Sequence, residues 1–102
     1  MSNPARKPLT KSEIRTALAE LPGWAFKSDK LTKKFEFPKF PDAVAFIVRL
    51  GFEAEKLDHH PELANVYNRV VISLNTHDAG GKVTGMDAEL ARKIEKVRAA
   101  MS

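Results

Sequence analysis

Residues 31–61 read LTKKFEFPKFPDAVAFIVRLGFEAEKLDHHP, and the spacing of their apolar side chains changes along the stretch. From Leu31 to Phe37 apolar and polar residues alternate almost throughout, which is typical of a strand with one buried face. From Asp42 to about Leu57 apolar residues recur at spacings of three and four, which predicts a helix with a core-facing stripe. Pro61 then favours extended geometry at His60, so the helix should end before the histidine pair. The stripe comprises Ala43, Phe46, Ile47, Leu50, Ala54 and Leu57.

The residues before this stretch predict one helix and one hairpin. Thr10 and Glu13 have the spacing of a capping box, so a helix should begin there and run to about Leu21. Residues 24–26 form a short apolar run that a polar turn at residues 28–30 joins to the alternating strand. Residues 1–8 are polar and basic with two prolines, which predicts a flexible tail ahead of one domain at residues 9–102.

The residues after the stretch predict a second hairpin and a last helix. Residues 63–67 and the β-branched run 70–75 should be strands, with the turn at Asn68-Arg69. A loop with two glycines follows at residues 77–81, and Thr84 with Asp87 predicts another capping box before a helix that ends near residue 99. The resulting order, α-β-β-α-β-β-α, predicts an α+β fold: an antiparallel four-stranded sheet with three helices on one face.

Composition excludes several classes of protein. The chain has 102 residues, enough for one domain, and it has no cysteine, so disulfides, thiol catalysis and cysteine-based zinc sites are excluded. No run is apolar enough to cross a membrane, and the beginning of the chain lacks the apolar core of a signal peptide. We therefore expect a soluble, cytoplasmic protein.

The net charge of +4 does not indicate a nucleic-acid-binding face. Three of the 17 basic residues lie in the first twelve positions, which contain no acid, so 14 basic residues face 13 acidic ones in the remainder. The densest basic run, from Lys27 to Lys39, is interrupted by Asp29 and Glu36. Because nucleic-acid binding needs a clustered basic surface, a solvated hairpin is the better interpretation.

All three histidines of the chain lie near predicted element ends, and three interpretations of them remain open. They could be unrelated polar residues. They could form a three-histidine metal site, although neighbours such as His59 and His60 rarely point at one ion and match no helix-based ligand spacing. They could also perform metal-free acid–base chemistry, with His77 brought back to the pair and Glu55 or Asp58 orienting an imidazole. In that case the polar groups of a ligand could be held by Asn65, Thr76, Asp78 and the amides near Gly80.

Three segments together resemble the pterin-4a-carbinolamine dehydratases, and the element order agrees from Leu9 to Val97. The combination of E-K-x-x-H-H-P, N-V-Y-N and T-H at these distances is specific, whereas H-H-P alone would be weak. The segments are EKLDHHPE at residues 55–62, NVYNRV at residues 65–70 and THDAG at residues 76–80.

The resemblance implies the activity of a 4a-hydroxytetrahydrobiopterin dehydratase, a hydro-lyase that needs neither metal nor organic cofactor. It implies dehydration of a 4a-hydroxytetrahydropterin to the quinonoid dihydropterin, a step that recycles the pterin used by aromatic amino acid hydroxylases. It also implies a homodimer or homotetramer. By resemblance, the catalytic residues would be His59, His60, His77 and Glu55, and the pterin would contact His59, His60, Pro61, Thr76, His77, Asp78 and Ala79.

A second function remains open beside the enzyme. Some animal relatives bind a homeodomain transcription factor and promote its dimerisation through a helical surface. The alternative to a dehydratase is therefore a non-catalytic protein-interaction module. Retention of all three histidines and of Glu55 favours the enzyme.

Overall fold

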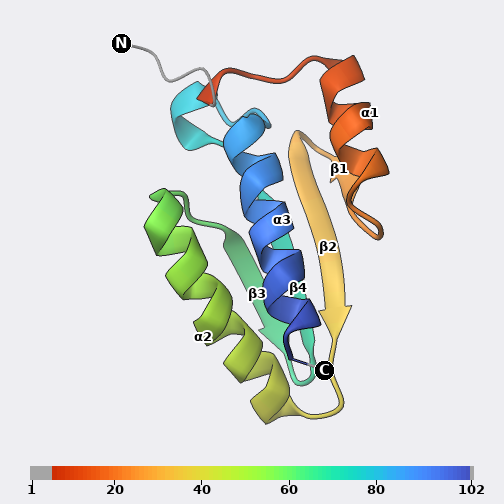
Figure 1. Cartoon of the computed structure of the whole chain (residues 1–102), viewed down its shortest axis with the longest axis vertical. Helices are drawn as coiled ribbons and strands as arrows, with labels where there is room; N and C mark the ends of the chain where they lie inside the picture. The colour runs from red at the N-terminus through yellow and green to blue at the C-terminus, as the bar shows by residue number, and fades with distance from the viewer. Residues whose placement is uncertain (1–5, 102) are drawn as a thin grey trace.

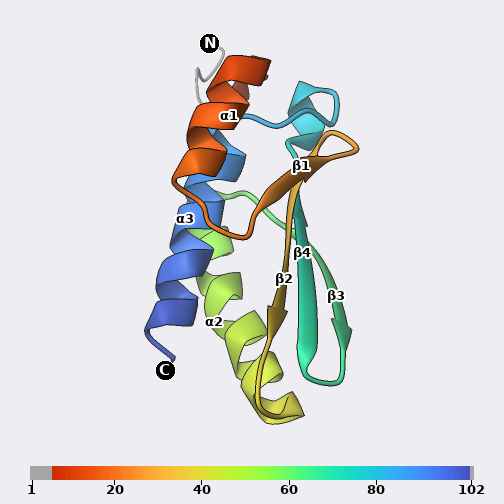
Figure 2. The ribbon, with the colours of Figure 1, turned by 90° about the vertical axis from the view of Figure 1, so that its right-hand side faces the viewer.

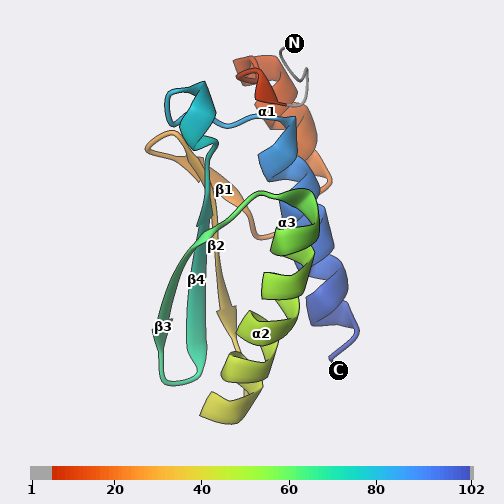
Figure 3. The ribbon, with the colours of Figure 1, turned by 90° about the vertical axis from the view of Figure 1, so that its left-hand side faces the viewer.

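The computed structural model describes residues 6–101 and confirms the predicted α+β order. The four strands form one antiparallel sheet in the order β1-β2-β4-β3 (Figure 1). β1 pairs with β2 and β3 pairs with β4 as two hairpins, and β2 pairs with β4 at the centre of the sheet. The three α-helices cover one face of the sheet (Figures 2 and 3). The elements are α1 (Lys11–Ala19), β1 (Ala25–Lys27), β2 (Lys30–Glu36), α2 (Phe40–Leu57), β3 (Glu62–Val66), β4 (Arg69–Leu74), the 3₁₀ helix η2 (His77–Ala79) and α3 (Gly85–Ala99).

The two predicted capping boxes are present and begin the helices that they were expected to begin. The Thr10 hydroxyl accepts from the Glu13 amide while the Glu13 carboxylate accepts from the Thr10 amide, which ties down the first turn of α1. Thr84 and Asp87 do the same for α3. The first five residues of the predicted flexible tail lie outside the described residues. Within the remainder of that segment, Pro8 forms a bridge with Thr84.

The core lies between the helices and one face of the sheet. Alternate residues of β2 and β4 face α2 and α3 and are fully or almost fully buried, except Lys33, which is partly buried and pairs with Glu95 of α3. The intervening residues face away from the helices. On α2 the predicted stripe faces inward: Ala43, Phe46, Leu50 and Ala54 are buried and Ile47 and Leu57 are partly buried. The inward residues of the sheet are Leu31, Phe35, Val70, Ile72 and Leu74.

The turn of the second hairpin differs from the prediction by one residue. Tyr67 and Asn68 form the turn, and Arg69 already pairs with Val66 in the sheet. Tyr67 has a φ of 51°, a conformation that side chains with a Cβ adopt reluctantly. The Asn65 amide holds this turn by donating to the Tyr67 and Arg69 carbonyls. An aromatic residue thus occupies a turn because a side chain two positions earlier satisfies the backbone there.

In Figure 1, η2, the beginning of α3 and the segment before α1 lie together at the top of the molecule, and the end of α2 lies below η2. Backbone bonds join these parts: the Leu9 amide donates to the Val83 carbonyl at 2.8 Å and the Thr76 amide to the Lys82 carbonyl at 2.8 Å. The fold therefore brings both histidine-bearing segments to a common place. Within residues 6–101 no helix is long and apolar enough to cross a membrane.

Candidate active site

A left-handed residue at the end of α2 sends the two adjacent histidines in different directions. Asp58 has a φ of 49° and a ψ of 44°, and the His59 amide returns to the Ala54 carbonyl at 3.1 Å. This arrangement ends the helix in the same way as a glycine at that position would, and aspartate tolerates it better than most residues with a Cβ. After this turn His59 is 5% exposed, whereas the side chain of His60 is 62% exposed.

His59 is held by a carboxylate that is completely buried. Its Nε2 lies 2.5 Å from Oδ1 of Asp87, which has 0% exposure at the start of α3. The same carboxylate accepts at Oδ2 from the Thr76 hydroxyl at 2.9 Å and from the Thr84 amide at 2.8 Å. An ionised carboxylate can only accept, so with Asp87 ionised Nε2 of His59 carries a proton and donates it. The nitrogen of His59 that remains for a ligand is therefore Nδ1.

The two threonines extend this arrangement into a directional hydrogen-bonded chain. The Thr84 hydroxyl accepts from the Met86 amide at 3.2 Å and lies 2.6 Å from the Thr76 hydroxyl. Since the Thr76 hydroxyl gives its own proton to Asp87, it accepts from Thr84. Among the described residues no buried side-chain nitrogen or oxygen lacks a partner. The imidazole of His59 is therefore fixed in position by a network in which every member is satisfied.

His60 pairs with a carboxylate in a quite different environment. Its Nε2 lies 3.0 Å from Oε1 of Glu55, and the Glu55 side chain is 79% exposed. Water and ions screen such a pair, so it restrains His60 only weakly. The predicted link between Glu55 and the histidines is thus made to His60 and not to His59.

The short 3₁₀ helix η2 presents the third histidine. Simple alternation along β4 continues through Asn75 and Thr76, so Thr76 points inward to Asp87 while His77 is exposed. The η2 turn is closed by the Gly80 amide, which donates to the His77 carbonyl at 3.1 Å, and Gly80 has a φ of 71°. A glycine suits this position because a residue with a Cβ would be strained there.

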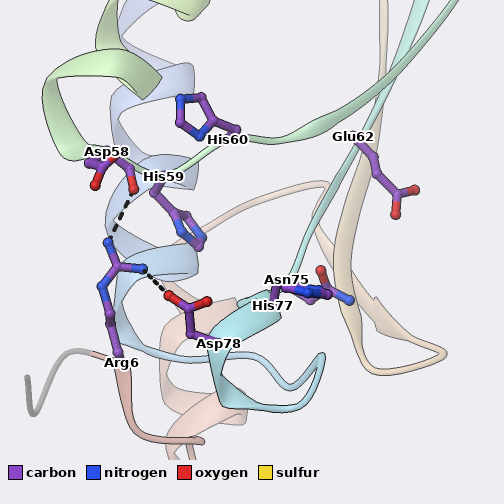
Figure 4. A pocket seen from close by; sticks show the side chains of 8 residues that line it. All are labelled: Arg6, Asp58, His59, His60, Glu62, Asn75, His77 and Asp78. Carbon is purple, nitrogen blue, oxygen red and sulfur yellow. Dashed lines mark hydrogen bonds and ion pairs between the residues drawn. The ribbon is translucent and has the colours of Figure 1, made fainter. Parts of the chain in front are cut away.

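These segments surround a pocket of about 370 Å³. His59 and His60 approach it from the chain that leaves α2, while His77 and Asp78 approach it from η2 (Figure 4). The lining is strongly polar and carries both signs of charge. The lining residues are Arg6, Asp58, His59, His60, Glu62, Asn75, His77 and Asp78.

The structure thus brings four of the predicted site residues together and places the others around them. His59, His60, His77 and Asp78 line the pocket. Glu55 contacts His60 from outside the lining, and Thr76 lies beneath the pocket with its hydroxyl committed to Asp87. Pro61 and Ala79 are chain neighbours of lining residues without being part of the lining themselves. Asn65 does not line the pocket, and its side-chain NH₂ group donates to two carbonyls of the hairpin turn.

Four residues of the site were not predicted from the sequence: Asp87, Arg6, Asn75 and Glu62, the last of which lines the pocket. Asp87 was recognised only as a helix cap, although its second oxygen was free for a distant partner. Arg6 was assigned to a tail, and Asn75 to the outer face of a strand. The one available signal for Asp87 was its place in the capping box, because the cap uses one carboxylate oxygen and leaves the other to accept from a distant donor.

Geometry also bears on the three-histidine metal site that the sequence left open. Within residues 6–101 no group of three histidine, aspartate or glutamate side chains is arranged to hold a metal ion. In this structure Nε2 of His59 faces Asp87 and Nε2 of His60 faces Glu55. The arrangement is suited to the transfer of protons to and from a small polar ligand.

Comparison with known proteins gives a consistent result. A family model described as "Pterin 4 alpha carbinolamine dehydratase" matches residues 7–97. A protein of Opitutus terrae named "Putative pterin-4-alpha-carbinolamine dehydratase" is 56% identical over 89 residues, which cover 87% of this chain and 92% of that protein. A protein of Sulfolobus acidocaldarius with the same name is 44% identical over 90 residues, covering 88% of this chain and 98% of that protein.

A solved structure extends this similarity to three dimensions. The crystal structure of a "transcriptional coactivator/pterin dehydratase" from Brucella melitensis superimposes with a TM-score of 0.85 and 41% sequence identity. It covers 89% of this chain and 98% of that chain.

Proposed function

Because this chain belongs to the pterin-4a-carbinolamine dehydratase family, we propose that it is itself a hydro-lyase that dehydrates a 4a-hydroxytetrahydropterin. The observation that carries this proposal is the pocket in which His59, His60 and His77 meet, with His59 fixed by the buried Asp87. The product is the quinonoid dihydropterin, and its release would return the pterin to the cycle that serves an aromatic amino acid hydroxylase.

The reaction needs two proton transfers and no change of oxidation state overall. The bond between carbon 4a and the hydroxyl oxygen breaks, a ring nitrogen loses its proton, and one molecule of water leaves. Hydroxide is a poor leaving group, so an acid should protonate the hydroxyl as the bond breaks, while a base takes the proton from nitrogen. A positioned acid or base contributes about a hundred- to ten-thousand-fold to such a step.

We assign the two transfers to His59 and His77, which reach the pocket from different segments. His59 acts through Nδ1, because its Nε2 is bound to Asp87. Asp87 holds the imidazole in one tautomer and stabilises it when it carries an extra proton, as a buried carboxylate does in other histidine-dependent enzymes. His60 binds the substrate, with Glu55 supporting it from the solvent side.

Dehydratase activity can be measured directly. A pterin-dependent hydroxylase generates the carbinolamine, and its decay is followed by ultraviolet absorbance in the presence of the purified protein. The proposal expects decay much faster than the spontaneous rate, at protein concentrations far below that of the substrate. The alternative, a protein-interaction module without catalysis, predicts that a folded protein leaves the spontaneous rate unchanged.

We also propose that the reaction needs neither a metal ion nor an organic cofactor. Support comes from the partners of His59 and His60, whose Nε2 atoms face carboxylates in this structure. Chelation should leave the rate unchanged. Loss of activity on chelation, restored by a single metal, would revive the three-histidine metal site.

We propose further that the protein works as a homodimer or homotetramer. Beside its buried stripe, α2 has a second stripe of exposed apolar side chains spaced four residues apart, and strand β3 is an exposed edge. Covering such a stripe with a second copy removes apolar surface from water. The exposed fractions are 46% for Phe40, 38% for Val44, 53% for Val48 and 67% for Phe52.

Light scattering tests this assembly. The wild-type protein should give the mass of a dimer or tetramer at micromolar concentration, and Val48→Lys with Phe52→Lys should reduce the mass. Arg49→Ala, on the same helix but outside the stripe, serves as the matched control. A monomer mass for the wild-type protein would contradict the proposal.

A further inference from the structure

Arg6 connects the two segments that carry the histidines. Its Nη2 donates to the backbone carbonyl of Asp58 at 3.1 Å, and its Nη1 lies 4.0 Å from Oδ2 of Asp78 (Figure 4). Asp58 directly precedes His59, and Asp78 directly follows His77. One guanidinium therefore bridges the chain on both sides of the pocket.

The backbone next to Arg6 is held close to this place. Pro8 bridges to Thr84, and the Leu9 amide donates to the Val83 carbonyl at 2.8 Å, so the segment lies against the start of α3. The Arg6 side chain is only 26% exposed, although its partner Asp78 is 77% exposed. Arg6 is thus a partly enclosed member of the pocket lining.

The two contacts suit arginine and not a general positive charge. The guanidinium is a rigid planar fork that can donate to two acceptors at once, whereas a lysine ammonium is a single point on a flexible stem. The Asp58 carbonyl belongs to the peptide bond that leads into His59, at the left-handed end of α2. His59 is already held by its contact with the buried Asp87. His77 and Asp78 of η2 are exposed and are therefore held less firmly than His59.

We propose that Arg6 is a positioning residue that sets the separation between the His59–His60 segment and the His77–Asp78 segment. The kinetic part of this inference rests on the proposed dehydratase function. Because His59 and His77 must act on one substrate at the same time, their separation controls the rate, and a displacement of about 1 Å at a reacting group can cost about a hundredfold. The ion pair itself is exposed on the Asp78 side and adds little to the stability of the fold.

The experiment compares Arg6→Ala and Arg6→Lys with Lys7→Ala, which removes one positive charge from the exposed neighbouring residue. Three quantities are measured for each variant: kcat and KM in the carbinolamine assay, the melting temperature, and amide hydrogen exchange in η2. The reporting amides are those of Ala79, Gly80 and Gly81, which are hydrogen-bonded to the carbonyls of Thr76 and His77.

Arg6→Ala should lower kcat/KM by about tenfold, a fraction of the loss that full misplacement would cause. It should also speed exchange at the three η2 amides, while the melting temperature stays close to that of Lys7→Ala. Arg6→Lys should recover only part of both effects, because the flexible lysine stem does not fix its charge in one place as the rigid planar guanidinium does. Lys7→Ala should match the wild-type protein.

Two results would overturn the inference. If Arg6→Ala matches Lys7→Ala in both exchange and kcat/KM, Arg6 does not position the two segments. If Arg6→Lys restores both fully, the rigid geometry of the guanidinium is not what sets the separation of the two segments. The proposed function is tested separately: a wild-type protein without dehydratase activity would refute that function, while the exchange measurement would still decide whether Arg6 restrains η2.

Discussion

His59 and His60 are neighbours in the chain, and each has a carboxylate partner, yet the structure gives the two pairs opposite surroundings. The His59–Asp87 pair is buried, with 5% and 0% of the side chains exposed, and three donors converge on Asp87. The His60–Glu55 pair has 62% and 79% of the side chains exposed. The surroundings of an imidazole–carboxylate pair therefore decide what the pair can do. The buried pair fixes a tautomer and a position, whereas the exposed pair leaves its histidine free to adapt to a ligand.

The largest effect should follow the loss of the buried carboxylate. Asp87→Ala leaves the Nε2–H of His59, the Thr76 hydroxyl and the Thr84 amide without their acceptor, so the free energy of unfolding should fall by about 3–5 kcal/mol. Urea unfolding measures this quantity. Glu89→Ala, two residues along α3, is the matched control and should change it by less than about 0.5 kcal/mol.

A milder variant keeps this prediction testable if Asp87→Ala does not fold. In Asp87→Asn one side-chain oxygen can still accept, but the new NH₂ group points at one of the three groups that donate to Asp87. The variant should therefore lose part of its stability and most of its turnover. An Asp87→Asn variant with wild-type stability and wild-type kcat would show that the buried network does not hold His59.

The second comparison separates turnover from binding at the two adjacent histidines. His59→Ala should lower kcat by about a hundred- to ten-thousand-fold, because it removes a positioned acid or base. His60→Ala should mainly raise KM, provided that KM reports substrate binding. Steady-state kinetics well below the melting temperature of each variant measure both constants. Abolished turnover in His60→Ala with intact binding would reverse the two roles.

A smaller effect is expected from the threonine that supports Asp87. Thr76→Val has almost the same shape but lacks the hydroxyl that donates to Asp87 and accepts from Thr84, so it should cost about 1–3 kcal/mol of stability. Thr76→Ser keeps the hydroxyl and is the control. Equal unfolding free energies for the two variants would argue against the hydrogen-bonded chain.

The smallest effect should come from the exposed pair. Glu55→Gln should change the free energy of unfolding by less than about 1 kcal/mol, because solvent screens this contact. Any rise in KM should disappear when the substitution is made in the His60→Ala background, since Glu55 reaches the site only through His60. A large fall in kcat that persists in that background would give Glu55 a direct part in the reaction.

Much of the fold was predictable because local signals decide it. Thr10 and Thr84 mark helix beginnings through contacts three residues away, and the stripe on α2 needs only the helical repeat. Tyr67 shows where such signals fail: its aromatic ring favours a strand, but the Asn65 amide stabilises a turn there.

The site was harder to predict, because its determining contacts join residues that are far apart in the chain. The pattern around His59 indicated a carboxylate partner nearby in sequence, whereas the partner in the structure is Asp87, 28 positions away. Arg6 reaches Asp58 across 52 positions. Motif spacing identified which histidines belong to the site, but only the packing of α3 against the end of α2 shows which of them is buried.

The roles of His59 and His77 are tested most directly by the rate of carbinolamine decay with the double variant His59→Ala, His77→Ala, compared with the wild-type protein at the same concentration. We expect rapid decay with the wild-type protein and decay close to the spontaneous rate with a folded double variant, because the double variant lacks both proton-transferring groups. A folded double variant that keeps nearly full activity would contradict the assignment of the chemistry to this pair.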